Sequence, residues 1–361
     1  MHLQSIKLLN FKNYEEKNIA FSPHINCVVG ENGVGKTNLL DAIHYLCLTR
    51  SAFNTIEQQN ILHGAPFYMI QGMMEKQEKN FPIVCSYQQG KKKTFKVNQA
   101  EYEKFSEHIG RFPIVLVAPI DADLVREGSE VRRKFMDSVI AQTNKNYLSD
   151  LLSYTKSLKQ RNALLKQFAE RDYFDADLLS PYDGAIIQLS QKIGQVREAV
   201  IQELIPIFQK HYNSLVDHRE TVEMIYKTKV LTDDFPSFFR TFQAKERILL
   251  RTMQGIHKDD YVFSIGNHPL KKFGSQGQQK SFIVALKLAQ FEYMYQKLGE
   301  KPILLLDDIF DKLDDGRIAK LLQLLSQQQF GQVFITDARP ERSEKLLDTL
   351  TVEVKIHQIE L

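Results

Sequence analysis

Residues 30–37 read G-E-N-G-V-G-K-T and fit the phosphate-binding pattern G-x-x-x-x-G-K-[ST]. A short apolar run at 25–29 precedes this loop, and apolar residues at helical spacing follow it from Leu39. In such a strand–loop–helix unit, the glycines let backbone N–H groups close around phosphate oxygens, and the start of the helix adds a positive partial charge. The pattern therefore predicts an α/β protein that binds a nucleotide at a P-loop.

The side chains of this loop have separate expected roles. Lys36 should reach the β and γ oxygens of a triphosphate, and the Thr37 hydroxyl should hold Mg²⁺. We therefore expect ATP and Mg²⁺ as cofactors, with Lys36 as a catalytic residue. The residues assigned to ATP binding are Gly30, Glu31, Asn32, Gly33, Val34, Gly35, Lys36, Thr37 and Asn38.

A second apolar run ends in two carboxylates. Residues 303–306 are all aliphatic and lead directly into Asp307 and Asp308. In P-loop enzymes one such carboxylate holds the water shell of the metal, and the next can orient the attacking water. We assign Asp307 to the Mg²⁺ site, together with Thr37, and Asp308 to water activation as the second catalytic residue. A strand that merely ends in a charged turn is the alternative, and the pairing with Lys36 favours the ATPase interpretation.

The stretch F-G-S-Q-G-Q-Q-K at 273–280 opens a helical pattern ahead of the acidic strand end. It resembles the L-S-G-G-Q signature of ABC-type ATPases, in which this helix start completes the ATP site of a second subunit. The residues expected to act in this way on a partner copy are Ser275, Gln276, Gly277 and Gln278. The match is imperfect, because Gln276 replaces a glycine. Ser275 is also a good N-cap for an ordinary helix.

Two further positions bear on the ABC-type interpretation. Asp314 falls where such heads carry a D-loop that crosses the dimer, and it is equally suited to cap the next helix. The histidine that transporter ATPases carry after the next strand is absent, since 333–336 lead into Asp337. This departure argues against a transporter motor and leaves the γ-phosphate sensor unassigned.

Apolar periodicity divides the chain into a head and an insertion. Strand patterns occupy 25–29, 81–87, 94–97, 114–117, 303–306 and 333–336. Helical stripes run through 151–165 and 186–204, with a break at 174–182, and predict two antiparallel helices. We therefore predict an ABC-type P-loop ATPase head with a mixed sheet, made of residues 1–120 and 245–361. A short, mostly helical arm domain, residues 121–244, is inserted between the P-loop and the signature.

Composition excludes some alternatives and leaves others open. The sequence contains no run of eighteen uncharged apolar residues and no signal-peptide layout at its start, so we expect a cytoplasmic protein without membrane contact. Its three cysteines are far apart, which argues against a disulfide framework or a zinc site. A net charge of +3 does not identify a nucleic-acid partner, because such binding depends on where the charges cluster.

Four further segments resemble the RecF family of bacterial DNA-repair ATPases. They are L-L-N-F-K-N-Y at 8–14, R-R-K-F-M-D at 132–137, L-K-Q-R-N-A-L-L at 158–165 and G-I-H-K-D-D at 255–260. The departures from the family pattern are mild, because lysines that replace arginines keep the charge and lose only the bidentate fork. These segments extend the resemblance over essentially the whole chain.

The resemblance implies a function that the residues alone do not. It implies a slow ATPase that forms an ATP-dependent homodimer and binds DNA near junctions of single- and double-stranded DNA in recombinational gap repair. RecO and RecR would be partners in loading RecA. The alternatives are an SMC-like head with another role in DNA maintenance, a metabolic P-loop phosphotransferase, and a scaffold that binds nucleotide without hydrolysing it.

Several basic clusters are candidates for contact with DNA phosphates. Lysines occur together at 91–93 and at 271–272. The candidates that gain weight from the resemblance are Arg132, Arg133, Lys134, Lys159 and Arg161. Such residues would contact phosphates without reading sequence. They are equally suited to bracing the arm or to lining a solvated helix face, and the sequence does not separate these interpretations.

Overall fold

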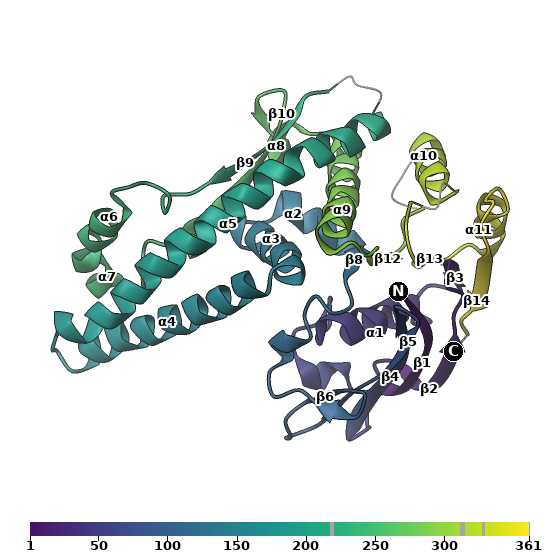
Figure 1. The fold of residues 1–361 in the computed structure, drawn as a ribbon, viewed down its shortest axis with the longest axis horizontal. Coiled ribbons are helices and arrows are strands. Elements are labelled where there is room, and N and C mark those ends of the chain that lie inside the picture. Colours follow the sequence, from purple (N-terminus) through teal and green to yellow (C-terminus); the bar gives the residue numbers. More distant parts are fainter. Residues whose placement is uncertain (217–219, 311–314, 327–328, 361) are drawn as a thin grey trace. The chain divides into compact units, whose positions relative to one another are not determined.

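The computed structural model describes residues 1–216, 220–310, 315–326 and 329–360. They form two compact units (Figure 1). The head unit consists of Met1–Asp121, His211–Asp217 and Lys280–Leu361, and the helical unit consists of Ala122–Lys210 and His218–Gln279. No helix in the described residues is long and apolar enough to cross a membrane.

The head unit contains a five-stranded sheet in the order β14-β3-β13-β12-β8, in which every neighbouring pair is parallel. Its strands are β3 (Ile25–Val29), β8 (Ile114–Val117), β12 (Ile303–Leu306), β13 (Val333–Asp337) and β14 (Val354–Gln358). Every residue of β3, β12 and β13 is buried. Continuous burial is typical of central parallel strands covered on both faces, as the apolar runs predicted.

A second sheet of the head unit is antiparallel, with the order β2-β1-β4-β5-β6-β7. Its strands are β1 (His2–Phe11), β2 (Tyr14–Ala20), β4 (Phe67–Lys76), β5 (Lys79–Gln88), β6 (Thr94–Val97) and β7 (Ala100–Glu101). Helix α1 (Lys36–Leu48) packs against strands of both sheets and is buried almost all round. The mixed strand directions predicted for the head are therefore sorted into two separate sheets around α1.

The remaining elements of the head unit are shorter, apart from the long helix α9, which begins in the helical unit. They are η1 (Glu57–Asn60), η2 (Phe105–Glu107), η3 (Pro119–Ala122), α9 (Gln276–Leu298), α10 (Asp315–Ser326) and α11 (Pro340–Leu347). Residues 281–291 of α9 are all buried, so most of this helix belongs to the core. The fold class, an α/β head with a helical arm, is confirmed.

The helical unit is built on two long antiparallel helices, as the two apolar stripes predicted. They are α4 (Lys145–Glu170) and α5 (Ala176–Val216). Polar contacts join Asp150 to Lys192 and Arg161 to Asp183, so residue numbers rise on one helix as they fall on the other. The other helices of this unit are α2 (Asp123–Arg126), α3 (Ser129–Thr143), α6 (Phe235–Thr241), α7 (Gln243–Leu249), η4 (Ile256–Lys258) and α8 (Leu270–Phe273).

The break between the two long helices is shorter than the predicted one at 174–182, which was wrong in its extent. Helix α5 already begins at Ala176 and contains Pro181. The side chain of Asp175 accepts the backbone N–H of Asp177, at 2.9 Å, and so starts the helix ahead of the proline. Each proline inside a helix removes one backbone hydrogen bond, and α5 nevertheless continues past both Pro181 and Pro206.

A three-stranded antiparallel sheet, in the order β11-β10-β9, completes the helical unit. Its strands are β9 (Val222–Lys227), β10 (Asp260–Ile265) and β11 (His268–Pro269). Because β10 pairs with β9, residues 245–279 lie in the same compact unit as the arm helices. The sequence pattern placed them in the head, since strand signals return after residue 231 without showing which strands pair.

Candidate nucleotide-binding site

The P-loop connects β3 to α1, in the position that its sequence context predicted. Gly33 has a φ of 89° and Gly35 a φ of 110°, both in the left-handed region that favours glycine. The Lys36 ammonium donates to the main-chain carbonyls of Gly30, at 2.7 Å, and Glu31, at 2.8 Å. The lysine therefore folds over the loop and holds its shape.

Asp307, which directly follows β12, is hydrogen-bonded to the helix that begins after the P-loop. The Thr37 hydroxyl donates to the Asp307 carboxylate at 2.9 Å, and the Thr336 hydroxyl donates to the same carboxylate at 2.8 Å. Burial raises the pKa of Asp307, and the two hydroxyl donors oppose that rise. The structure thus brings together Thr37 and Asp307, which the sequence assigned to one metal site from positions far apart in the chain.

Asp308, the next residue, has a left-handed backbone conformation and a carboxylate without a hydrogen-bond partner among the described residues. Its φ is 53°, and its backbone N–H donates to the Thr336 hydroxyl at 2.9 Å. Among the described residues, the Asp308 carboxylate has no hydrogen-bond or ion-pair partner within the usual distance limits. Burial lowers the pKa of Lys36, and the nearby charges of Asp308 and Asp307 act in the opposite direction.

Thr336 is a site residue that sequence reasoning missed. It lies on β13, and its hydroxyl touches both acidic neighbours, accepting from the Asp308 N–H and donating to Asp307. A threonine at the end of an apolar strand carries no signal of its own. Only the parallel pairing of β12 with β13 shows that it stands beside the two carboxylates.

The turn between β1 and β2 clamps the P-loop, which the sequence analysis also did not foresee. The Asn13 side-chain amide donates to the Val34 carbonyl at 2.9 Å, and the Tyr14 hydroxyl donates to the Gly35 carbonyl, also at 2.9 Å. Asn38 donates in turn to the Asn13 side-chain oxygen at 2.8 Å. Both clamp residues lie in the segment 8–14 that resembles the RecF family, which was the available signal.

An open hollow of about 1030 Å³ adjoins this clamp. Its lining includes Lys12, Asn13, Asn38, Phe53, Ile56 and His63. The Lys12 ammonium pairs with the buried Asp41 carboxylate at 2.6 Å and lies 5.6 Å from the centre of the Phe53 ring. The hollow therefore has an aromatic and polar wall next to the P-loop.

The predicted signature forms the start of α9, in the helical unit. The Ser275 hydroxyl accepts the Gln278 backbone N–H at 3.2 Å, and the Gln278 side-chain oxygen accepts the Ser275 N–H at 2.7 Å. This reciprocal pair is a capping box, so Ser275 does cap an ordinary helix. Ser275 and Gln276 are nevertheless exposed, and Gly277 is half-buried. Capping therefore leaves this helix start open to solvent.

The two remaining ABC-type positions have different outcomes. Asp314 lies outside the described residues. Asp337, which follows the strand where transporter ATPases carry a histidine, is fully buried and pairs with Arg342 at 2.7 Å. Ser343 also donates to the Asp337 carboxylate. This carboxylate is therefore occupied within the head unit.

Arg132 and Arg133, two of the candidates for DNA contact, are engaged inside the helical unit. Arg132 makes a two-pronged pair with the Asp260 carboxylate, at 2.9 and 3.1 Å. Arg133 donates to the main-chain carbonyl of Asp259 at 2.6 Å and to the Ser129 hydroxyl at 2.7 Å. These contacts favour the bracing interpretation for Arg132, whereas Arg133 hydrogen-bonds to neutral oxygens and forms no ion pair among the described residues.

Arg161 is only 1 % exposed. Its guanidinium pairs with Asp183 at 2.6 Å and with Glu246 at 2.8 Å, and it donates to the Thr252 hydroxyl at 2.9 Å. A guanidinium buried in this way has no surface to offer a phosphate, so the bracing interpretation holds for Arg161. By contrast, Lys134 and Lys159 are exposed, and their contact with DNA stays a prediction.

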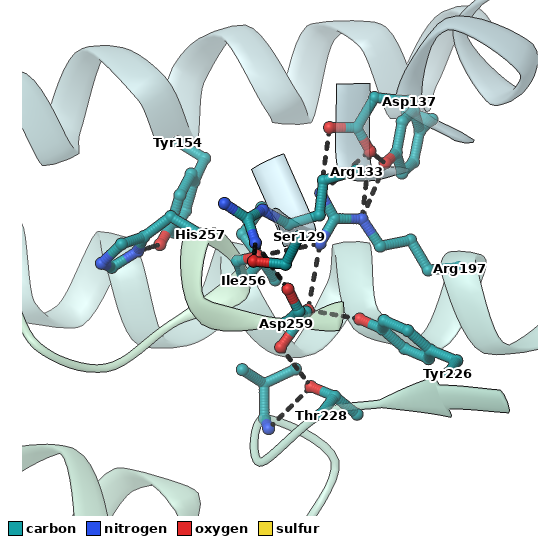
Figure 2. Close-up of polar contacts among 12 residues, drawn as sticks. Ser129, Arg133, Asp137, Tyr154, Arg197, Tyr226, Thr228, Ile256, His257 and Asp259 are labelled. Atoms are coloured by element: carbon teal, nitrogen blue, oxygen red, sulfur yellow. Dashed lines mark hydrogen bonds and ion pairs between the residues drawn. The ribbon is translucent and has the colours of Figure 1, made fainter. Parts of the chain in front are cut away.

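Arg197 of α5 is the centre of a buried network that the sequence did not reveal (Figure 2). Its guanidinium pairs with Asp137 at 2.8 Å and with Asp259 at 3.0 Å, and donates to the Ile256 carbonyl at 3.1 Å. Burial raises the pKa of Asp259, and hydrogen bonds from Tyr226 and others together with the Arg197 charge lower it. The network ties α3, α5 and the start of β10 together.

Comparison with known proteins places this geometry in a family. The RecF/RecN/SMC N terminal domain model matches residues 2–359. The DNA replication and repair protein RecF of Flavobacterium johnsoniae is 47% identical over 359 residues, which cover 99% of this chain and 100% of that protein.

Solved structures agree with the sequence comparison. A structure of the recombination mediator protein RecF-ATPrS in the RecFOR pathway superposes with a TM-score of 0.88 at 28% identity, covering 99% of this chain and 96% of that one. A structure of RecF-ATP in the same pathway gives a TM-score of 0.86 at 29% identity, covering 93% and 92%. With the P-loop, the acidic strand end and the capped signature helix in their expected elements, the chain belongs to the RecF family of DNA replication and repair proteins.

Proposed function

We propose that this chain is an ATP-dependent DNA-binding protein of recombinational gap repair, in which slow ATP hydrolysis acts as a switch. The observation that carries the proposal is the 2.9 Å contact between the Thr37 hydroxyl and the Asp307 carboxylate, beside Lys36. It joins the phosphate-binding helix to the acidic strand end, which is the arrangement that P-loop ATPases need for a metal–triphosphate complex.

The P-loop holds the phosphates in this proposal, and the neighbouring hollow takes the nucleoside. Lys36 exchanges a loop carbonyl for a phosphate oxygen, and the backbone N–H groups of 33–37 surround the β phosphate. The Asn13 clamp keeps the loop in shape while this happens. Support for ATP as the nucleotide comes from the RecF structure described as RecF-ATP.

The residues present also fit Mg²⁺. A threonine hydroxyl and a carboxylate are hard oxygen ligands, and Mg²⁺ usually takes only one or two protein ligands, completing its shell with water and phosphate oxygens. Thr37 and Asp307 supply that small set. The metal would neutralise charge that develops on the phosphates.

Asp308 is the residue that we assign to water activation. Its carboxylate is free of partners among the described residues, and its backbone is fixed by Thr336. It can therefore accept a proton from an attacking water without first breaking a contact. A base with no second group to orient it is consistent with slow turnover.

We propose that ATP binding joins two copies of the chain into a homodimer. The exposed start of α9, with Ser275, Gln276, Gly277 and Gln278, would face the triphosphate held by a partner copy, and Asp314 would cross the same interface. An exposed helix N-terminus suits this role because its positive partial charge attracts negative charge.

The biological setting rests on the family. The proposed ligand is DNA near junctions of single- and double-stranded regions, bound without sequence specificity in the cytoplasm. RecO and RecR are the proposed partners in loading RecA. The RecF relatives are described as belonging to the RecFOR pathway, which supports this assignment.

A DNA-binding titration tests the proposal. A fluorescent gapped duplex is titrated with the full chain in the presence of ADP, ATP or a non-hydrolysable ATP analogue. We expect tight binding with the analogue and weak binding with ADP. In the Asp308→Asn variant, ATP itself should act like the analogue, whereas Asp233→Asn, which changes an exposed carboxylate, should behave like the unaltered chain. Equal DNA affinity under all three nucleotide conditions would refute the switch.

A further inference from the structure

The loop at 251–259, which joins α7 to β10, has a fixed shape. It starts after Leu250, whose φ is 54°, and contains Gly255 with a φ of 130°. A Cβ atom at Gly255 would lie 2.4 Å from the Tyr154 hydroxyl, so no other residue fits there without displacing a buried side chain. A loop held this tightly presents its exposed side chains from a rigid base.

Side chains of helices α4 and α5 form hydrogen bonds with this loop. The Asn162 side chain accepts the Thr252 backbone N–H at 2.8 Å, and Arg197 donates to the Ile256 carbonyl at 3.1 Å. Tyr154 and His257 are joined at 2.6 Å, as Figure 2 shows beside Ile256. The buried members of the loop are thus anchors.

Two long cationic side chains of the same loop are not among these anchors. Arg251 and Lys258 are exposed, while Thr252, Ile256 and Asp259 are buried. Neither cation has an ion-pair partner among residues 1–216, 220–310, 315–326 and 329–360. A hydrogen bond of 3.1 Å joins His257 to the Thr252 carbonyl, so the residues next to Arg251 and Lys258 in the chain are in contact. The two cations are therefore neighbours.

The nearby carboxylates do not neutralise this cluster, because they are committed elsewhere. Asp259 is occupied by Arg197 at 3.0 Å and by the Thr228 hydroxyl at 2.7 Å. Asp260 is occupied by the two-pronged pair with Arg132. Acidic residues usually lie close to exposed cations and compensate their charge. Here Asp259 and Asp260 are bound to other residues instead.

Arg133 adds a third positive charge to the same place. Its guanidinium binds the main-chain carbonyl of Asp259, the residue after Lys258, at 2.6 Å. That carbonyl and the Ser129 hydroxyl are neutral acceptors. The charge of Arg133 also helps to lower the pKa of Glu130, but that carboxylate is paired with Lys134 at 2.7 Å. Burial lowers the pKa of Lys258, and repulsion from Arg251 and Arg133 lowers it further, as expected for neighbouring cations.

We propose that Arg251 and Lys258, backed by Arg133, form a contact site for the backbone phosphates of duplex DNA. The inference rests on the proposed DNA-binding function and names a surface for it. Long exposed side chains on a rigid loop suit a polyanion that offers a phosphate every few ångströms, since they contact charge without enclosing a ligand. A small free anion would need buried donors around it, which Arg251 and Lys258 do not provide.

The test compares two double variants of the full chain with the same loss of charge. Arg251→Gln with Lys258→Gln removes the proposed contacts. Lys166→Gln with Arg171→Gln removes one lysine and one arginine that are also exposed, elsewhere on the unit. Affinity for a fluorescent duplex is measured at several salt concentrations with the ATP analogue present. Binding of a fluorescent ATP analogue and the thermal unfolding temperature are measured alongside.

The loop variant should bind duplex on the order of tenfold more weakly near 0.15 M salt. The negative slope of log affinity against log salt should become shallower by about 2, because each lost phosphate contact reduces its magnitude by about 0.9. Its nucleotide affinity and unfolding temperature should not change. The control variant should keep the affinity and slope of the unaltered chain. If the unaltered chain binds DNA and the loop variant matches it, the loop assignment is overturned while the proposed function stands. An unaltered chain that does not bind DNA would overturn both.

Discussion

Asp307 in the head unit and Asp259 in the helical unit are buried carboxylates in closely similar settings. Burial raises the pKa of each. Each also accepts hydrogen bonds from two hydroxyl groups, Thr37 and Thr336 in one case and Tyr226 and Thr228 in the other. They differ in one respect. Asp259 pairs with Arg197 at 3.0 Å, whereas Asp307 has no cationic partner in an ion pair among the described residues.

This difference separates a structural cluster from the proposed ligand site. A buried carboxylate that is not matched by a positive charge is costly, and a fold that keeps one usually uses it to bind a cation or a proton. In the helical unit Arg197 is that cation, and the network is complete. At Asp307 the charge of Lys36 acts without an ion pair, and the Mg²⁺ that we propose would supply the direct contact. Residue types alone do not distinguish the two clusters, but the partner of each charge does.

The largest expected effect comes from removing the internal cation. Arg197→Met leaves Asp137 and Asp259 buried without a counter-charge, which should lower the free energy of unfolding of the helical unit by about 3–5 kcal/mol. Urea denaturation followed by circular dichroism measures this change. Lys134→Met, in which the lost side chain is 75% exposed, is the matched control and should cost less than about 0.5 kcal/mol. A similar small cost for Arg197→Met would show that the buried network does not brace the unit.

Removing Lys36, the cation of the proposed ligand site, should instead weaken nucleotide binding and leave the stability of the fold nearly unchanged. Lys36→Met loses its two bonds to loop carbonyls, which folding tolerates, and loses the charge that meets the phosphates. We expect nucleotide affinity to fall at least about 100-fold, or roughly 2.7 kcal/mol, with an unfolding temperature close to that of the unaltered chain. Titration calorimetry with ATP and Mg²⁺ measures the loss. Retained ATP binding would contradict the assigned role of Lys36.

A smaller effect is expected from Thr336→Val, which removes a hydrogen bond and keeps the shape. The Thr336 hydroxyl stabilises the charged form of Asp307 and so lowers its pKa, while burial raises it. Losing the hydroxyl should therefore raise that pKa further, and the acidic side of the pH–rate profile for Mg²⁺-dependent hydrolysis should move to higher pH. The maximal rate should fall by roughly tenfold, since Asp308 also loses its backbone contact. An unshifted acidic side would mean that Asp307 does not control the reaction.

Local patterns in the sequence predicted much of the site. The P-loop, the strand that ends at Asp307 and the arm helices all follow from apolar periodicity and from motifs that are continuous in the chain. Thr336 and Asn13 were missed because their contacts depend on which strands become neighbours. Arg197 was missed for a related reason, since a single arginine on a long helix shows its role only when Asp137 and Asp259 close around it.

The most direct test of the account is the mass of the particle in solution, measured by light scattering after size exclusion. With a non-hydrolysable ATP analogue and Mg²⁺, the unaltered chain and the control Thr155→Arg should have twice the mass that they show with ADP. The Ser275→Arg variant should bind the analogue and keep the monomer mass under both conditions. Dimers of Ser275→Arg that persist with the analogue, or an unaltered chain whose mass does not depend on the nucleotide, would contradict an ATP site shared between two copies.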